Sequence, residues 1–250
     1  VGDTHAKGLW AVAVKVDIAP REEVPMGAGS YDGPEWGIHS RPEANLLAFW
    51  VGSAPPLVFV SIDALYVGSA VRNVLEANLP GIPPENIVLG ASHTHAAPML
   101  DDTKPKLGLP DPEHMRMVLG KLADAATDLM DPKVRRRALI SAGKSCGDHS
   151  VNRRQLKRIT WTWPPRFNTL RWGPDFWGTR DENITALRIE SDDGQPLGVI
   201  WNYACHPVMF PLERTVSTHF PGRVREAIRG EWGSELPVVY YQGFSGDTRP

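Results

Sequence analysis

Two histidines separated by a single residue, His93 and His95, are the side chains whose type and spacing most directly suggest chemistry. In an extended segment, residues i and i+2 project to the same side, so both imidazoles can reach one point. The pair can supply two nitrogen ligands to a metal ion, or one ligand and one proton carrier. A third histidine, His206, follows another strand-like segment. Because neutral imidazole suits Zn²⁺, the pattern favours a zinc site, although His-X-His also occurs where the rings only hydrogen-bond loop carbonyls.

Four further polar residues lie near the ends of predicted elements. In open α/β sheets ligands bind in the crevice beyond the carboxyl ends of the strands. Asp63 and Asp247 follow predicted strands and are candidates for catalysis, although an acid at a strand end as often caps a turn. Arg153 could bind a carboxylate or an oxyanion, or stack on a tryptophan. His219, just before a predicted helix at Pro221, could be a further ligand or only a neighbour of the helix cap.

The elements that position these residues alternate between strands and helices. Apolar runs rich in β-branched and aromatic residues predict strands over 9–18, 44–51, 57–62, 87–91, 138–142, 184–189, 197–204 and 236–241. Apolar residues at helical spacing predict helices over 67–79, 111–129 and 220–232. A turn at Asp192-Asp193-Gly194 indicates one hairpin. The sequence therefore predicts an α/β fold, a mixed β-sheet with flanking helices and its active site at the carboxyl ends of the strands.

The stretch 153–181 fits neither period and is predicted to be a long ordered loop. It contains four tryptophans and three prolines. Long loops in compact domains are usually functional or disordered, and the tryptophans argue for order. Trp161 and Trp163 are candidates for substrate binding, because aromatic rings can cover an acyl chain or stack on a sugar.

The composition is that of a globular domain without a strongly charged partner. The chain has 250 residues, and its 27 basic and 29 acidic residues give a formal net charge of −2. Such a chain has no basic field for binding phosphates, which argues against nucleic acid as a partner. No run approaches the roughly 18 consecutive apolar residues of a membrane-spanning helix. The two cysteines, Cys146 and Cys205, lack the spacing of a metal or redox motif.

Seven short motifs stand in the order found in the N-terminal catalytic domain of the neutral/alkaline, non-lysosomal ceramidases. They are Asp17-Ile18-Ala19-Pro20, Gly37-Ile38-His39, Val60-Ser61-Ile62-Asp63, Ser92-His93-Thr94-His95, Asn152-Arg153-Arg154, Tyr203-Ala204-Cys205-His206-Pro207 and Gly246-Asp247-Thr248-Arg249-Pro250. Each motif is short, and their shared order over essentially the whole chain carries the resemblance. Members of that family are zinc amidohydrolases that split the N-acyl bond of a sphingoid base.

The resemblance implies a role for each matching residue. His93 and His206 would be ligands of one zinc ion per chain. His95 would lie beside the metal, where it would hydrogen-bond the reacting amide or shuttle a proton. Arg153 would face the substrate carbonyl and stabilise the oxyanion. The implied function is hydrolysis of an amide bond by a metal-bound water, whose pKa the zinc lowers toward ~7, in lipid metabolism.

Three departures from the family pattern modify this expectation. Arg249 stands where the family has an active-site serine, so that serine's role is lost and a cation points toward the site, which favours an anionic substrate rather than ceramide. His219 stands where relatives more often have aspartate. We count both residues among the substrate-binding candidates. The family's remaining ligands, a glutamate and a tyrosine, lie downstream of the last motif. We therefore expect residues 1–250 to be an N-terminal portion of a catalytic domain that a downstream segment or a second chain completes.

Two other functions stay open at the level of sequence. A serine-type esterase or amidase could use Ser245 or Ser92, although neither lies in a Gly-X-Ser-X-Gly elbow. A binding module on the same scaffold, without catalysis, would hold an acyl or glycan ligand on its tryptophans. The expected partner is a small amide or lipid-like substrate, with peripheral membrane contact for access to it, and a periplasmic or secreted location is favoured over a cytoplasmic one.

Overall fold

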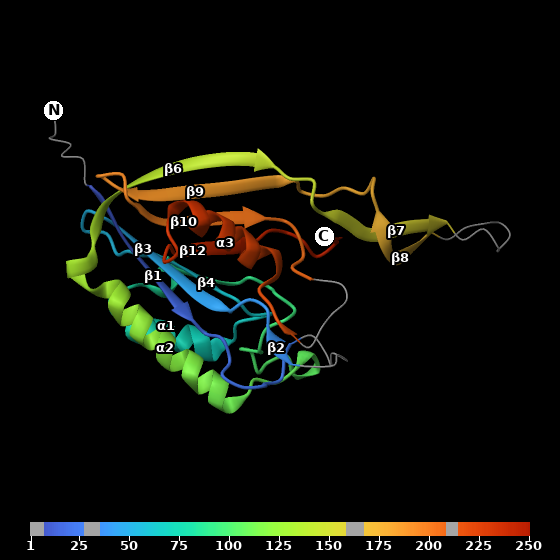
Figure 1. Cartoon of the computed structure of the whole chain (residues 1–250), viewed down its shortest axis with the longest axis horizontal. Helices are drawn as coiled ribbons and strands as arrows, with labels where there is room; N and C mark the ends of the chain where they lie inside the picture. Colours follow the sequence, from blue (N-terminus) through green and yellow to red (C-terminus); the bar gives the residue numbers. More distant parts are fainter. Residues whose placement is uncertain (1–7, 28–35, 159–167, 209–214) are drawn as a thin grey trace.

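The computed structural model describes residues 8–27, 36–158, 168–208 and 215–250, and its centre is a sheet of eight strands (Figure 1). In spatial order these are β12 (Val238–Gln242), β10 (Pro196–Tyr203), β9 (Asn183–Ser191), β6 (Arg136–Cys146), β1 (Leu9–Asp17), β3 (Glu43–Val51), β4 (Leu57–Ile62) and β5 (Ile87–Ala91). The pairs β4–β5 and β10–β12 are parallel, and the other pairs are antiparallel. The predicted mixed sheet is confirmed.

The sheet folds over on itself between β6 and β1. Only two residue pairs join these strands, Trp10 with Arg137 and Ala11 with Arg136. The inner faces of the two halves then pack on each other, with Leu47 and Phe49 of one half in the same buried cluster as Ile189, Ile200 and Val239 of the other. Face-to-face packing of two sheets buries both inner surfaces in one core.

Helices cover the two outer faces. Helices α1 (Ser69–Asn78) and α2 (Pro112–Met130) pack against β1, β3 and β4, and α3 (His219–Trp232) packs against β10 and β12 (Figure 1). Helix α2 begins where the sequence predicts, because the Asp111 side chain accepts the amide protons of Glu113 and His114. Three short 3₁₀ helices cover Pro84–Asn86, Pro105–Leu107 and Pro132–Val134. Within the described ranges, no helix is long and apolar enough to cross a membrane.

The long loop predicted over 153–181 is wrong. Strands β7 (Val151–Arg158) and β8 (Asn168–Asp175) form an antiparallel hairpin there, and β13 (Thr248–Arg249) adds a third strand (Figure 1). The period of two is hard to recognise in this sequence, because the apolar Leu156 and Leu170 are exposed and stand among arginines, tryptophans and other polar residues. Trp161 and Trp163 lie outside the described residues. A further short pair joins β2 (Gly37–Ile38) and β11 (Thr215–Val216).

The folding of the sheet brings four carboxyl ends together. Strand β12 crosses β4 and β5: the Ser61 hydroxyl donates to the carbonyl of Tyr240 at 2.6 Å, and the Tyr241 hydroxyl donates to the carbonyl of Val88 at 2.7 Å. Since β10 runs parallel to β12, the ends of all four strands point to the same side of the molecule. The histidines predicted to act together follow two of these strands.

Candidate metal centre and active site

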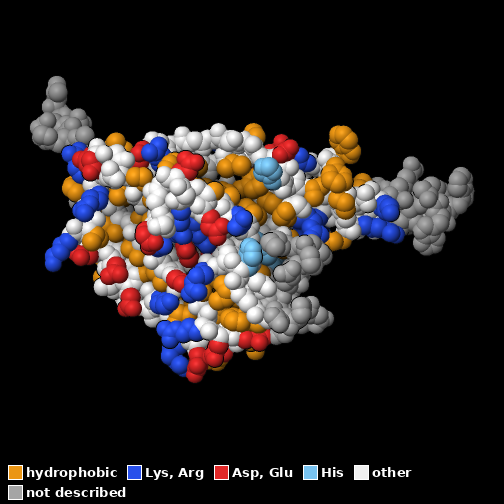
Figure 2. Space-filling view, in the orientation of Figure 1, with side chains coloured by type: hydrophobic (Ala, Val, Ile, Leu, Met, Phe, Trp, Pro, Cys, Tyr) orange, Lys and Arg blue, Asp and Glu red, His pale blue; other side chains and the backbone are white. Residues whose placement is uncertain are grey.

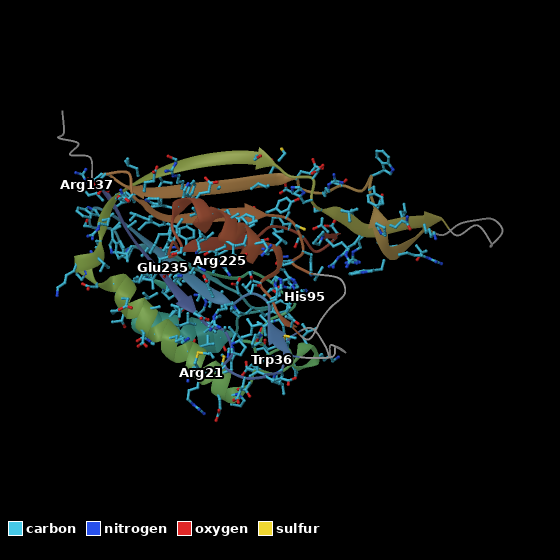
Figure 3. All side chains as sticks on the ribbon, viewed as in Figure 1. Arg21, Trp36, His95, Arg137, Arg225 and Glu235 are labelled. Carbon is cyan, nitrogen blue, oxygen red and sulfur yellow. The ribbon has the colours of Figure 1, made fainter. Side chains whose placement is uncertain are left out.

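His93, His95 and His206 form one compact group of imidazoles. Their nearest ring nitrogens all lie within 4.8 Å of one another. The ring centroids are 4.8 to 5.0 Å apart. His93 and His95 follow β5, and His206 follows β10. Figure 3 shows His95 at the end of the sheet that faces the β7–β8 hairpin.

Main-chain carbonyls orient two of the three rings. Nδ1 of His93 lies 2.9 Å from the carbonyl oxygen of Leu65, after β4, and Nδ1 of His206 lies 3.1 Å from that of Ser245, after β12. A carbonyl can only accept, so each Nδ1 carries the proton and each Nε2 presents a lone pair. A carbonyl on the far nitrogen is the usual support of a metal-binding histidine. Sequence reasoning missed Leu65 and Ser245 because a main-chain carbonyl has no residue signature.

His95 differs from the other two rings. Its Nε2 lies 2.9 Å from Nε2 of His206. The latter atom must accept, because His206 carries its proton on Nδ1, so His95 donates from Nε2. In this arrangement the Nε2 lone pair of His206 accepts the His95 proton, while His93 presents its own Nε2 lone pair at the same centre.

The surroundings keep the three rings neutral. Burial lowers the pKa of His95 to about 3 and that of His206 to about 4, and it also lowers the pKa of His93. The positive charge of Arg153 acts in the same direction on all three rings. A metal ion needs the neutral imidazole, so this environment favours ligation at neutral pH.

These residues fit a zinc ion. Neutral imidazole nitrogens are among the ligands that Zn²⁺ prefers, and the Nε2 atoms of His93 and His206 carry no proton and come from two different strand ends. A bound ion would replace the His95 proton on Nε2 of His206. The backbone of His93 also has a φ of 63°. This left-handed conformation is rare for residues other than glycine and is found most often where function requires a fixed side chain.

The cations predicted for the site lie beside the histidines, on β7 and β13. Nε and Nη2 of Arg153 donate to the carbonyl of Gly246 at 3.3 and 2.9 Å, and its guanidinium lies 4.3 Å from the ring centroid of Trp172. The charge of Arg249 also contributes to the lowered pKa of His206. Asp247 accepts the amide proton of Arg153 on its main-chain oxygen at 2.7 Å. The Asp247 residue therefore positions Arg153.

The Asp63 side chain pairs with an arginine of α3 and does not belong to the histidine group. Its carboxylate lies 2.8 Å from Nη1 of Arg225 and accepts the amide proton of Glu43 at 3.0 Å. Both side chains of the ion pair are buried. Sequence reasoning could not see this pairing, because Arg225 lies on α3, far from Asp63 in the sequence.

Neither serine has the geometry of an activated nucleophile. Ser245 and Ser92 are buried, and in the described part of the chain no histidine ring is hydrogen-bonded to either hydroxyl. His206 contacts the carbonyl of Ser245, and the Ser245 hydroxyl accepts from the side chain of Gln242. The described geometry gives the serine-type alternative no support.

Comparison with known proteins identifies a fold rather than a family. No protein-family model and no curated protein sequence matches the chain. Among solved structures, a neutral ceramidase from Pseudomonas aeruginosa aligns with a TM-score of 0.74 and 17% sequence identity, over 97% of this chain and 39% of that one. A ceramidase complexed with C2 aligns with a TM-score of 0.75 and 18% identity, over the same shares. The chain therefore has the fold of the neutral ceramidases along nearly its whole length, and it spans 39% of the length of these two proteins.

Proposed function

We propose that this chain carries the histidine part of a zinc-dependent amidohydrolase that cleaves an N-acyl amide bond. The observation behind the proposal is that the three rings differ at one centre. The Nε2 atoms of His93 and His206 carry no proton, whereas Nε2 of His95 does. The ceramidase-like fold supports the same reaction class, because the structural relatives are ceramidases.

The chain's own residues would bind zinc, hold a proton and stabilise charge. His93 and His206 would hold the ion through Nε2. When bound, Zn²⁺ supplies Lewis-acid chemistry that polarises a carbonyl and makes water a stronger nucleophile near neutral pH. As the oxygen of water bonds to the carbonyl carbon, the C–N bond breaks and the amine nitrogen takes up a proton. His95 is suited to that transfer, because an ion on Nε2 of His206 would release the proton on Nε2 of His95 from its present acceptor.

Arg153 would stabilise the negative charge that develops on the carbonyl oxygen. Its guanidinium is held by the Gly246 carbonyl and the Trp172 ring, and its backbone is held by the bond to Asp247. A donor held in place before the reaction does not have to reorganise during it, which is why such groups contribute strongly to catalysis. The ceramidase resemblance further suggests that a glutamate and a tyrosine complete the metal site, supplied by a downstream segment or a second chain.

Zinc binding tests the proposal directly. Mass spectrometry of the metal content should find about one zinc per chain, as a single catalytic site requires. His93→Ala and His206→Ala should each weaken zinc affinity by more than about 100-fold, because residues that only orient ligands already contribute 10–100-fold. His149→Ala is the matched control, since the His149 side chain is 81% exposed and lies outside the group.

The outcomes separate the alternatives. Release of amine from N-acyl amides, inhibited by a chelator and unaffected by a serine-reactive phosphonate, would agree with the proposal. Zinc retained by the double variant His93→Ala, His206→Ala would refute the ligand assignment. Zinc binding without turnover of any amide, measured on the complete natural protein, would instead favour a binding module.

A further inference from the structure

A pocket of about 350 Å³ opens at the N-terminal end of α3, next to the histidine centre. Its volume is within the range of small-molecule sites. Val208, Phe220 and Pro250 give it an apolar lining, and the polar side chains among its described residues include His39, His219 and Arg223.

His219 is the feature that indicates a ligand. Its side chain lines the pocket and is only 5% exposed, yet neither ring nitrogen has a hydrogen-bond partner in the described part of the chain. Leaving a buried polar group unpaired costs about 1–3 kcal/mol. A ligand that pairs with the ring would remove this cost. Burial lowers the pKa of His219 to about 4, so the neutral ring offers one N–H donor.

The surroundings of His219 favour a negatively charged ligand. Helix α3 has no acidic residue in its first turn, and its N-cap residue Thr218 makes no side-chain cap. The Thr218 hydroxyl is bonded to that of Ser40 instead, at 2.8 Å. The His219 amide donates to the Ser217 hydroxyl at 3.1 Å, so a neutral hydroxyl, and no acidic side chain of the first turn, lies at the positive end of the helix dipole. Arg223 adds a full charge at the pocket, and its Nη1 lies 3.0 Å from Glu226.

The pocket and the metal centre share their supporting backbone. The amide of Ser217, which also lines the pocket, donates to the carbonyl of Ala96 at 2.7 Å, and the Thr94 hydroxyl donates to the carbonyl of Ser217 at 2.6 Å. These bonds tie the segment on both sides of His95 to the segment that enters α3. Val208, which also lines the pocket, follows His206 by two residues. The pocket therefore lies beside the backbone that carries the histidines.

We propose that this pocket binds the carboxylate of an apolar substrate or product. If the carboxylate belongs to the substrate, the enzyme prefers N-acyl amides that carry an anionic group. The inference rests on the proposed function for the reaction, and on the pocket alone for the ligand. The carboxylate accepts the His219 N–H and pairs with Arg223, while the hydrocarbon part lies on Phe220 and Val208.

Direct binding of small probes tests the site without any catalysis. Calorimetric titration of the natural protein should show that hexanoate binds about tenfold more tightly than hexanol or hexylammonium, as a charge-assisted hydrogen bond predicts. His219→Asn, which tolerates the left-handed backbone of φ 50°, should weaken hexanoate binding about tenfold. Arg223→Gln should weaken it about threefold, because that side chain is 71% exposed.

Arg116→Gln is the matched control, since it removes the same charge from the exposed surface of α2. It should leave hexanoate binding unchanged. The exposed position of Arg223 means that its variant will fold, so the test does not depend on His219→Asn. Equal binding of hexanoate and hexanol, or binding unaffected by both pocket variants, would overturn the proposal.

Two amides that differ by one charge distinguish the sources of the carboxylate. If it belongs to the substrate, hexanoyl-glycine should have a kcat/KM about tenfold above that of hexanoyl-glycinamide. If it belongs to the acid product, the two values should be equal and hexanoate should inhibit competitively. Hexanoate binding without any hydrolysis would remove the proposed function and keep the site. Hydrolysis without hexanoate binding would remove the carboxylate site and keep the proposed function.

Discussion

At the scale of residues, the histidine centre depends on proton positions that main-chain atoms set. The residue types and strand-end positions of His93, His95 and His206 were enough to predict that they meet, and the structure brings them together. Which rings carry lone pairs could not be predicted, because the carbonyls of Leu65 and Ser245 decide it. Those carbonyls reach the rings only after four distant strands have converged.

Substitution of Arg153 tests the oxyanion role at this scale. Arg153→Gln should lower kcat by about 10²–10³, the usual effect of removing one donor to a developing oxyanion, while KM and zinc content change little. Arg154→Gln is the matched control, because it removes the same charge from the next residue of β7, whose side chain is exposed. An equal loss of kcat in the two variants would show that the general positive field matters, rather than the position of Arg153.

At the scale of elements, two arginines of α3 tie that helix to the ends of β3 and β4. Arg229 makes two bonds of 2.8 Å to the Glu43 carboxylate, and Arg225 lies 2.8 Å from Asp63. Figure 3 shows Arg225 beside α3 in the interior of the fold. The helix itself was predictable from its apolar spacing. Its electrostatic connection to the sheet was not, because the partners are about 160–190 residues apart, and spacing rules describe only near neighbours.

Acid should weaken this connection. Burial of Glu43 raises its pKa, but the Arg229 hydrogen bond and the charges of Arg225 and Arg229 lower it more, so the pKa lies below the ordinary 4.5. A group with a lowered folded-state pKa stabilises the fold above its unfolded pKa and loses that effect as the pH falls through the folded value. Glu43→Gln should therefore lower the free energy of unfolding by about 3 kcal/mol at pH 7, since it removes the carboxylate that pairs with Arg229 and leaves the buried Arg225 with Asp63 alone.

Urea unfolding of wild type and variant across pH measures this effect. The difference between the two proteins should be constant from pH 7 to about 5. It should shrink below pH 4.5, where Glu43 is protonated in the unfolded chain, and should be lost as the pH falls through the lower pKa of the folded protein. Glu76→Gln, in a partly exposed i,i+4 pair with Arg72, should change stability by less than about 0.5 kcal/mol. A Glu43→Gln difference that is independent of pH would mean that packing, and not charge, is lost.

At the scale of the whole molecule, the sequence predicts one mixed sheet, and the structure folds that sheet into two packed halves. The nearly continuous apolar run of β3 makes both faces of the sheet apolar there. Its neighbours Leu46 and Leu47 point to opposite faces, and both are fully buried. What covers each face could not be predicted, because helices and a second sheet layer bury apolar surface equally well. The fold's extension, the β7–β8 hairpin, carries one apolar face made of Leu156, Leu170 and Trp172.

We propose that this apolar face makes the peripheral membrane contact through which a lipid-like substrate reaches the site. Leu156 and Leu170 are paired across the hairpin and are 60% and 63% exposed. The exposed cation Arg154, which pairs with Trp172, lies on the same face, and Figure 2 shows hydrophobic side chains gathered over this arm with basic ones beside them. Apolar side chains flanked by cations match the interface of an anionic bilayer, where each cation near the surface contributes about 1 kcal/mol.

Vesicle binding tests this surface. The double variant Leu156→Ser, Leu170→Ser should bind vesicles of phosphatidylcholine and phosphatidylglycerol at least tenfold more weakly than wild type in a sedimentation assay, because two apolar side chains no longer enter the bilayer. Wild-type binding should also fall at high salt or without phosphatidylglycerol, since screening removes the attraction of the cations. Leu139→Ser is the matched control: Leu139 is 61% exposed on β6, away from the hairpin, and its loss should leave binding unchanged. Equal weakening by Leu139→Ser, or vesicle binding that survives in the hairpin variant, would place the membrane contact elsewhere on the molecule.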